Sequence, residues 1–179
     1  VGNNTTFEDH LQEYGIQSFL ADGTKNQLNI PTFNNKPYDF IKKNLNSYND
    51  NNNITLRNWV EDKIGIKNES LLLQMDIENS EIPVLYQCDL DFLKRFKILT
   101  IEFHDFQFIG NDFGLRILTE LFDKILLNFT ICHIHPNNCC GCFKVNNYLI
   151  PRLMEITFIN KNSFKKSEKL KKKLPNELD

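Results

Sequence analysis

Two short apolar runs constrain the fold of this chain more than any other feature. Residues 70–77 read SLLLQMDI and residues 98–103 read ILTIEF, so each run is almost continuously apolar. Strands of a parallel sheet that is covered on both faces have this character. We therefore expect the two runs to be adjacent, parallel and buried strands.

Segments with the 3.6-residue period of an amphipathic helix lie between shorter apolar runs. The predicted helices cover residues 5–14, 55–64, 82–95 (in two pieces) and 112–127. The predicted strands cover residues 16–21, 38–45, 70–77, 98–103, 129–134 and 150–159. Strands that alternate with helices predict an α/β fold, a doubly wound and mostly parallel sheet with helices on both faces.

The last two predicted strands differ from the others because only a loop, residues 137–147, joins them. A parallel pair needs a long crossover connection, so these strands are expected to be antiparallel neighbours. We expect one domain over residues 1–160. Residues 161–179 form a Lys-rich tail, for which a solvated end and a contact with an acidic partner or a lipid surface both stay open.

Charge and hydropathy exclude two classes of partner. The formal net charge is −2, whereas a nucleic-acid-binding protein needs a basic surplus. No apolar run reaches the roughly 18 residues of a membrane helix. The odd set of five cysteines is typical of reduced thiols, which predicts a cytoplasmic protein.

Polar residues gather directly after the predicted strands. They are Asp22, Asp76, Glu78, His104 and His133. Ligands of open α/β sheets bind outside the carboxyl ends of the strands, so this placement predicts a functional crevice. We expect Asp76, His104 and His133 to share one catalytic site, where a carboxylate orients an imidazole that removes a proton. The alternative is that each side chain only caps a helix or satisfies its own loop.

The start of the chain has the form of a nucleotide-binding turn. Gly2, Asn3 and Asn4 precede a predicted helix, whose free N–H groups favour an anionic group. Asp22 follows 20 residues after Gly2, at the spacing where an acidic residue reaches a ribose hydroxyl. One glycine and one aspartate are equally compatible with a structural turn.

Two segments contain side chains that can bind a metal ion. The segment HIHPNNCCGC, residues 133–142, contains zinc-type ligands, but its spacing fits no common C-x-x-C pair. Asp76 and Glu78 are a carboxylate pair that can hold a divalent cation, and no further residue supports one. No residue is therefore assigned as a metal ligand.

Three segments resemble the FkbM-like family of S-adenosylmethionine-dependent methyltransferases. The opening VGNNTTFEDHLQEYG…FLADGT is similar to the family's cofactor-binding start, and LLLQMDIENSEIPVL is similar to its D-x-E-G-x-E segment. ILTIEFHDF and ICHIHPNN resemble later strands of one branch. The likeness covers residues 1–158. The chain departs from the family at Asn79, where glycine is usual, and it lacks the first strand.

The resemblance implies a class I methyltransferase fold whose first strand would precede Val1, so the 179-residue chain is expected to bind cofactor weakly or not at all. It implies that S-adenosylmethionine donates a methyl group to an oxygen of a small molecule or sugar. Gly2, Asn3 and Asn4 would line the methionine end of the cofactor, and Asp22 would hold its ribose. Two other functions stay open: a non-catalytic or metal-binding α/β module, and another nucleotide-dependent transferase acting on a glycan. Nothing in the sequence indicates the oligomeric state.

Overall fold

The computed structural model describes residues 5–25, 32–67, 70–104 and 106–165. The chain divides into two compact units, Val1–Ile66 and Lys67–Asp179, which are described separately.

The first unit contains two helices and several very short strands. The helices are α1 (Thr6–Glu13) and α2 (Leu56–Ile64). The strands are β1 (Phe19–Ala21), β2 (Thr32–Phe33), β3 (Lys36–Pro37), β4 (Asp39–Ile41), β5 (Asn44–Leu45) and β6 (Asn53–Ile54). They form three separate pairs: β1 with β4 in parallel, β2 with β3 antiparallel, and β5 with β6 in parallel.

Capping chemistry sets the ends of α2. Thr55 lies in extended conformation before the helix, and its side chain accepts a hydrogen bond from the Asn58 N–H. Gly65 ends the helix at φ 73°, a left-handed conformation that glycine adopts without steric cost. The strand expected over residues 38–45 is instead divided between β4 and β5, which pair with different partners.

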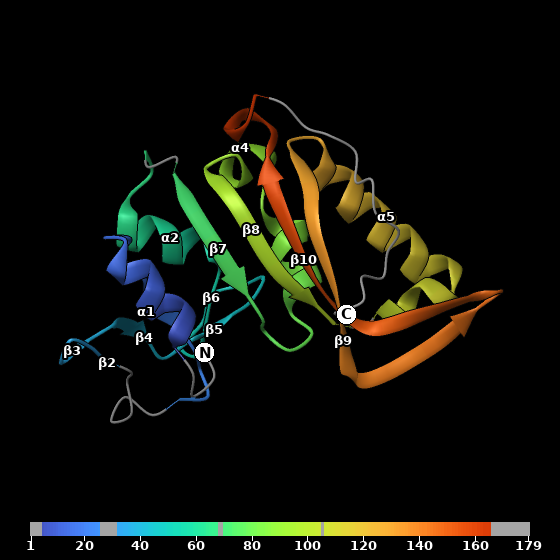
Figure 1. Ribbon diagram of the computed structural model, residues 1–179, viewed down its shortest axis with the longest axis horizontal. Coiled ribbons are helices and arrows are strands. Elements are labelled where there is room, and N and C mark those ends of the chain that lie inside the picture. The colour runs from blue at the N-terminus through green and yellow to red at the C-terminus, as the bar shows by residue number, and fades with distance from the viewer. Residues whose placement is uncertain (1–4, 26–31, 68–69, 105, 166–179) are drawn as a thin grey trace. The chain divides into compact units, whose positions relative to one another are not determined.

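The second unit is built on one four-stranded sheet in the order β7-β8-β10-β9 (Figure 1). The strands are β7 (Leu71–Met75), β8 (Phe96–Phe103), β9 (Phe129–Val145) and β10 (Tyr148–Asn160). β7 and β8 are parallel, and β10 is antiparallel to both of its neighbours. β10 is thus the one reversed strand of this sheet, and the prediction that the two apolar runs are parallel neighbours is confirmed.

Helices pack against one face of this sheet. The helices of this unit are α3 (Glu81–Gln87), α4 (Leu90–Leu93), α5 (Asp112–Leu126) and the 3-10 helices η2 (Phe106–Gly110) and η3 (Lys161–Ser163). Leu73, Leu99, Ile101 and Phe158 alternate toward a buried face, as the two-residue period of strands requires. On α5, Leu118, Leu121 and Ile125 are buried at helical spacing and complete this core.

The opposite face of the same sheet carries polar side chains. Thr100 pairs with Thr157, which in turn pairs with His133 across β10. Glu102 pairs with Glu155 in the same way. The doubly wound arrangement was predicted with apolar residues on both faces, whereas these positions are half-buried or exposed. The structure shows a mixed α/β fold with a mixed sheet.

The predicted loop over residues 137–147 is wrong. β9 continues to Val145, turns at Asn146 and Asn147, and returns as β10 from Tyr148. Asn146 has φ 52°, and asparagine tolerates this left-handed conformation better than other non-glycine residues. The two-residue turn joins the strands into a long hairpin, so the expected antiparallel pairing is confirmed over a longer span.

Candidate functional site

The site lies at the carboxyl ends of β7 and β8. β7 ends at Met75, and Asp76 is the first residue beyond it. Glu78 and Asn79 then form a turn with φ of 52° and 79° before α3 begins at Glu81. Because β7 ends early, Asp76 and Glu78 belong to a tight connection and not to a continued strand. This connection places three acidic side chains within six residues.

Glu81 links the end of β7 to the end of β8. Its side chain is 1% exposed, and its Oε1 accepts a hydrogen bond from the Ile77 N–H at 3.0 Å. The same oxygen lies 3.0 Å from Nδ1 of His104, the residue that follows β8. An ionised carboxylate only accepts hydrogen bonds, and Nδ1 is the donor when Glu81 is in that form. Glu81 therefore fixes both the tautomer and the orientation of the His104 ring.

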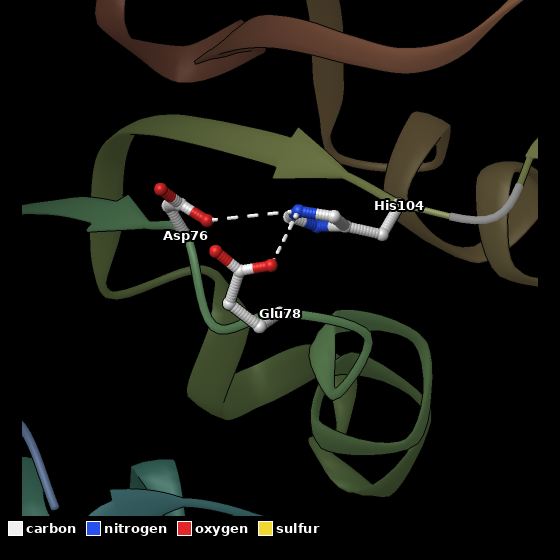
Figure 2. Close-up of side chains that lie close together, drawn as sticks. All are labelled: Asp76, Glu78 and His104. Carbon is white, nitrogen blue, oxygen red and sulfur yellow. Dashed lines mark ion pairs between the residues drawn. The ribbon is translucent and has the colours of Figure 1, made fainter. Parts of the chain in front are cut away.

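The other nitrogen of His104 faces two carboxylates (Figure 2). Nε2 lies 3.3 Å from Oε2 of Glu78 and 3.9 Å from Oδ1 of Asp76. The His104 side chain is 8% exposed, whereas Glu78 is 82% and Asp76 48% exposed. Nε2 of His104 thus faces a partly open acidic group.

The acidic residues repel one another in this small volume. Burial raises the pKa of Asp76 above its ordinary value, and the nearby charges of Glu102 and Glu78 raise it further, against the opposing effect of His104. Two chemical uses follow from the geometry. The cluster can take a proton from a ligand through Nε2. Alternatively, the ligand atoms of Asp76, Glu78 and His104, all within 4.8 Å of one another, can hold a divalent cation.

The structure brings Asp76 and His104 together, as predicted, but it does not bring His133 to them. His133 is exposed and lies inside β9, opposite Thr157. Asn137 is the residue of this strand that reaches the site edge, where its Nδ2 donates to Oε1 of Glu102 at 2.7 Å. His133 lies four residues earlier, roughly 13 Å back along the strand. The placement failed because β9 does not end where the apolar pattern ends.

The predicted cofactor residues belong to the first unit. Gly2, Asn3 and Asn4 lie outside the described residues. Asp22 follows β1, and its Oδ1 accepts hydrogen bonds from the Thr24 N–H at 2.8 Å and the Thr24 hydroxyl at 2.6 Å. Burial raises the pKa of Asp22, but opposing contributions, led by the hydrogen bond from the Thr24 side chain, leave it below its ordinary value. Asp22 is therefore an ionised carboxylate that orders its own loop.

The HIHPNNCCGC segment forms the outer part of β9. The rings of His133 and His135 stack with centroids 6.3 Å apart. Cys139 and Cys140 are exposed free thiols whose sulfur atoms lie 2.8 Å apart. Within the described part of the chain, no group of three metal-ligating side chains includes these residues. Residues 133–142 thus form an exposed arm of the β9–β10 hairpin, called the hairpin arm below.

A cavity of about 320 Å³ adjoins the His104–Glu81 pair. It lies between the start of α3, η2 and α5. Its apolar walls come from Ile82, Pro83, Phe108, Phe113, Ile117 and Leu118. Four polar residues complete the lining, and they are Asn79, Glu81, His104 and Asn111. The buried imidazole thus borders both an apolar cavity and an acidic cluster.

The comparison with known families covers most of the chain. The Methyltransferase FkbM domain matches residues 1–135. The chain belongs to the FkbM methyltransferase family. Comparisons with curated proteins and with solved structures found no match. The family match contains both strands of the site, the three acidic residues of the β7–α3 connection and His104.

The backbone conformation explains how Asn79 can replace the glycine that is usual in the family. The backbone of Asn79 has φ 79°, which glycine adopts freely and which asparagine tolerates better than larger residues. The FkbM chain therefore keeps the turn without its usual glycine. A separate finding concerns the helices: none in the described residues is long and apolar enough to cross a membrane.

Sequence reasoning missed two residues of the site. Glu81 lies in the first turn of α3, where an acidic side chain is favoured for the helix dipole alone, so its position in the sequence does not indicate its role. Its partner is His104, 23 positions later. Asn137 lay beyond the predicted end of its strand. The final glutamate of the D-x-E-G-x-E resemblance was the only available signal for Glu81.

Proposed function

We propose that this FkbM family member is an S-adenosylmethionine-dependent methyltransferase that methylates an oxygen of a small molecule. Membership of the family supports methyl transfer. The order β7-β8-β10-β9, with β10 as the one reversed strand, supports the class I arrangement. The five free cysteines fit the cytoplasmic location that we propose for it.

The orientation of His104 carries the proposal. A hydroxyl attacks a methyl group efficiently only when its proton is removed during the attack. Glu81 accepts from Nδ1, so Nε2 is the atom of His104 that takes this proton. The imidazolium that results is stabilised by Glu81 on one side and by Glu78 and Asp76 on the other. The new oxygen–methyl bond forms as the carbon–sulfur bond of the donor breaks.

The first unit has chemistry that fits the donor. S-Adenosylmethionine, when bound, supplies an electrophilic methyl group. Ionised Asp22 can accept hydrogen bonds from a ribose, since its pKa is below the ordinary value. Gly2, Asn3 and Asn4 complete the proposed cofactor residues at the methionine end. An Asp22→Asn variant removes the charge and should weaken cofactor binding by roughly 1–3 kcal/mol, as measured by calorimetry.

The direct test is methyl transfer from tritiated S-adenosylmethionine to a panel of neutral phenols, alcohols and sugars. The longest natural form of the chain should be used, and formation of S-adenosylhomocysteine should accompany each methylated product. The proposal expects labelled product with wild type and little with His104→Ala. Absence of cofactor binding and of any labelled product would contradict it.

Metal removal separates the two uses of the acidic cluster. If His104 takes the proton directly, methyl transfer persists in EDTA, and added Zn²⁺ inhibits it by occupying Nε2. If a cation held by Asp76, Glu78 and His104 activates the hydroxyl, EDTA abolishes transfer and Mg²⁺ or Mn²⁺ restores it. We expect the first result.

A further inference from the structure

The cavity beside His104 has polar groups at one end and apolar walls elsewhere. His104 and Glu81 form its buried polar end, and both are held rigidly by their mutual contact. Phe108 and Phe113 lie on η2 and α5, and their side chains are 45% and 74% exposed. Large aromatic side chains that remain this exposed around a concavity are typical of a binding surface. The cavity is therefore built for a ligand with one polar end.

Gly114 sets the shape of the cavity. A Cβ at this position would collide with the carbonyl oxygen of Phe108, so glycine lets η2 lie directly against α5. The Asn111 side chain accepts a hydrogen bond from the Gly114 N–H at 2.8 Å and fixes the start of α5. These contacts hold the Phe108 backbone in place on one side of the cavity. Gly114 and Asn111 thus determine the position of this apolar wall.

Charge excludes several ligand classes. Glu81 lines the cavity, Asp76 and Glu78 lie near the same imidazole, and Glu102 acts on Asp76. None of the residues that line the cavity is a lysine or an arginine. An anionic ligand such as a sugar phosphate, a nucleotide or a carboxylate would meet uncompensated repulsion. The ligand must carry no negative charge at the end that reaches His104.

Hydrogen-bonding capacity excludes a glycan. A sugar carries hydroxyls around its whole ring, and burying them against Ile82, Phe108 and Leu118 without partners costs several kcal/mol. A flat ring with one hydroxyl has the complementary pattern. Its faces can stack on the phenylalanines, and its polar end can meet His104 and Glu81. A volume of about 320 Å³ lies within the range of small-molecule sites.

From these observations we infer that the cavity bounded by α3, η2 and α5 binds an uncharged aromatic alcohol, with its ring on Phe108 and Phe113 and its hydroxyl end toward His104. As the methyl acceptor, this ligand rests on the proposed function and narrows it. The binding itself requires no cofactor. It can therefore be tested on the protein alone.

The experiment is a calorimetric titration of the whole chain with 2-naphthol and, separately, with methyl α-D-glucopyranoside. We expect saturable binding of 2-naphthol and none of the glucoside. Phe113→Ala should weaken naphthol binding roughly 3- to 10-fold, the usual loss of an aromatic contact. Phe113 is mostly exposed, so this variant should fold. Leu115→Ala, an exposed residue of the same helix that does not line the cavity, is the matched control and should bind as wild type.

Each other outcome overturns the inference. Failure of 2-naphthol to bind, or binding of the glucoside in its place, contradicts the chemistry assigned to the cavity. Equal weakening by Phe113→Ala and Leu115→Ala, or by neither, places the ligand elsewhere. Failure of methyl transfer is distinguishable from these results: naphthol that binds through Phe113 but is never methylated refutes the proposed function and leaves the aromatic-alcohol site standing.

Discussion

His104 and His133 follow similar apolar stretches of sequence, yet the structure gives them opposite surroundings. His104 lies beyond the end of β8, almost fully buried, between Glu81 and Glu78. His133 lies inside β9, exposed and stacked on His135. The difference is the start of α3, which brings a buried carboxylate to one histidine and none to the other. A histidine after an apolar run becomes a functional candidate when a second element supplies its partner.

The largest expected effect concerns the buried partner. Glu81→Ala leaves Nδ1 of His104 and the Ile77 N–H without their acceptor, so it should lower the free energy of unfolding by about 3–5 kcal/mol. His133→Ala removes only an exposed ring and should change it by less than about 0.5 kcal/mol. Urea denaturation of both variants measures the contrast.

Glu120→Ala is the matched carboxylate control for this comparison. Glu120 is an exposed residue of α5 that accepts a hydrogen bond from the Tyr86 hydroxyl. Its removal should leave the urea midpoint nearly unchanged. Equal effects of Glu81→Ala and Glu120→Ala would show that the buried contact does not distinguish His104 from His133.

The sequence could predict those residues of the site that directly follow the two parallel strands. The apolar runs over residues 70–77 and 98–103 identified β7 and β8, and parallel strands bring their carboxyl ends to one edge. Asp76 and His104 followed directly. Glu81 and Asn137 could not be predicted in this way. Their roles arise from contacts with His104 and Glu102 across the fold, which no local pattern records.

The extent of the last two strands shows the same limit. The hydrophobic pattern located the start of β9 but not its end, because the hairpin beyond residue 134 is stabilised by backbone pairing and by the turn at Asn146. Exposed hairpin arms need no apolar alternation. The prediction therefore placed His133 at the end of a strand, beside His104, whereas the residue lies within β9.

A smaller effect concerns the charge at Asp76. A raised pKa means that the folded state binds the proton of Asp76 more tightly than the unfolded state does. The stability that comes from this protonated form is lost as the pH rises through the raised pKa. Asp76→Asn should therefore stabilise the protein at pH 7, by less than about 1 kcal/mol because the side chain is half exposed. The gain should vanish below the unfolded pKa of about 3.9, where both forms are neutral.

Urea midpoints at pH 7 and pH 3 measure the Asp76 effect. Asp91→Asn is the control, since Asp91 is exposed and pairs with Lys94. This variant should show no gain at either pH. Destabilisation of Asp76→Asn at pH 7 would mean that the carboxylate is held by attraction and not crowded by its acidic neighbours.

The smallest effect is expected at the cysteines of β9. Iodoacetamide should modify the four exposed thiols of the folded protein and spare buried Cys88. Cys139 should react slowly at neutral pH, because the hydrogen bond with the Cys140 sulfur raises its pKa. Methyl transfer should be unchanged by this labelling. Its loss on labelling, with the fold retained, would assign a function to the hairpin arm and weaken the contrast with His104.

Single-turnover methyl transfer by His104→Ala and His133→Ala under saturating cofactor decides whether His104 is the general base. We expect His104→Ala to lower the rate roughly 10²–10⁴-fold, the usual contribution of a general base, while cofactor affinity stays at the wild-type value. His133→Ala should transfer at the wild-type rate. A full rate in His104→Ala, or equal losses in the two variants, would contradict the account.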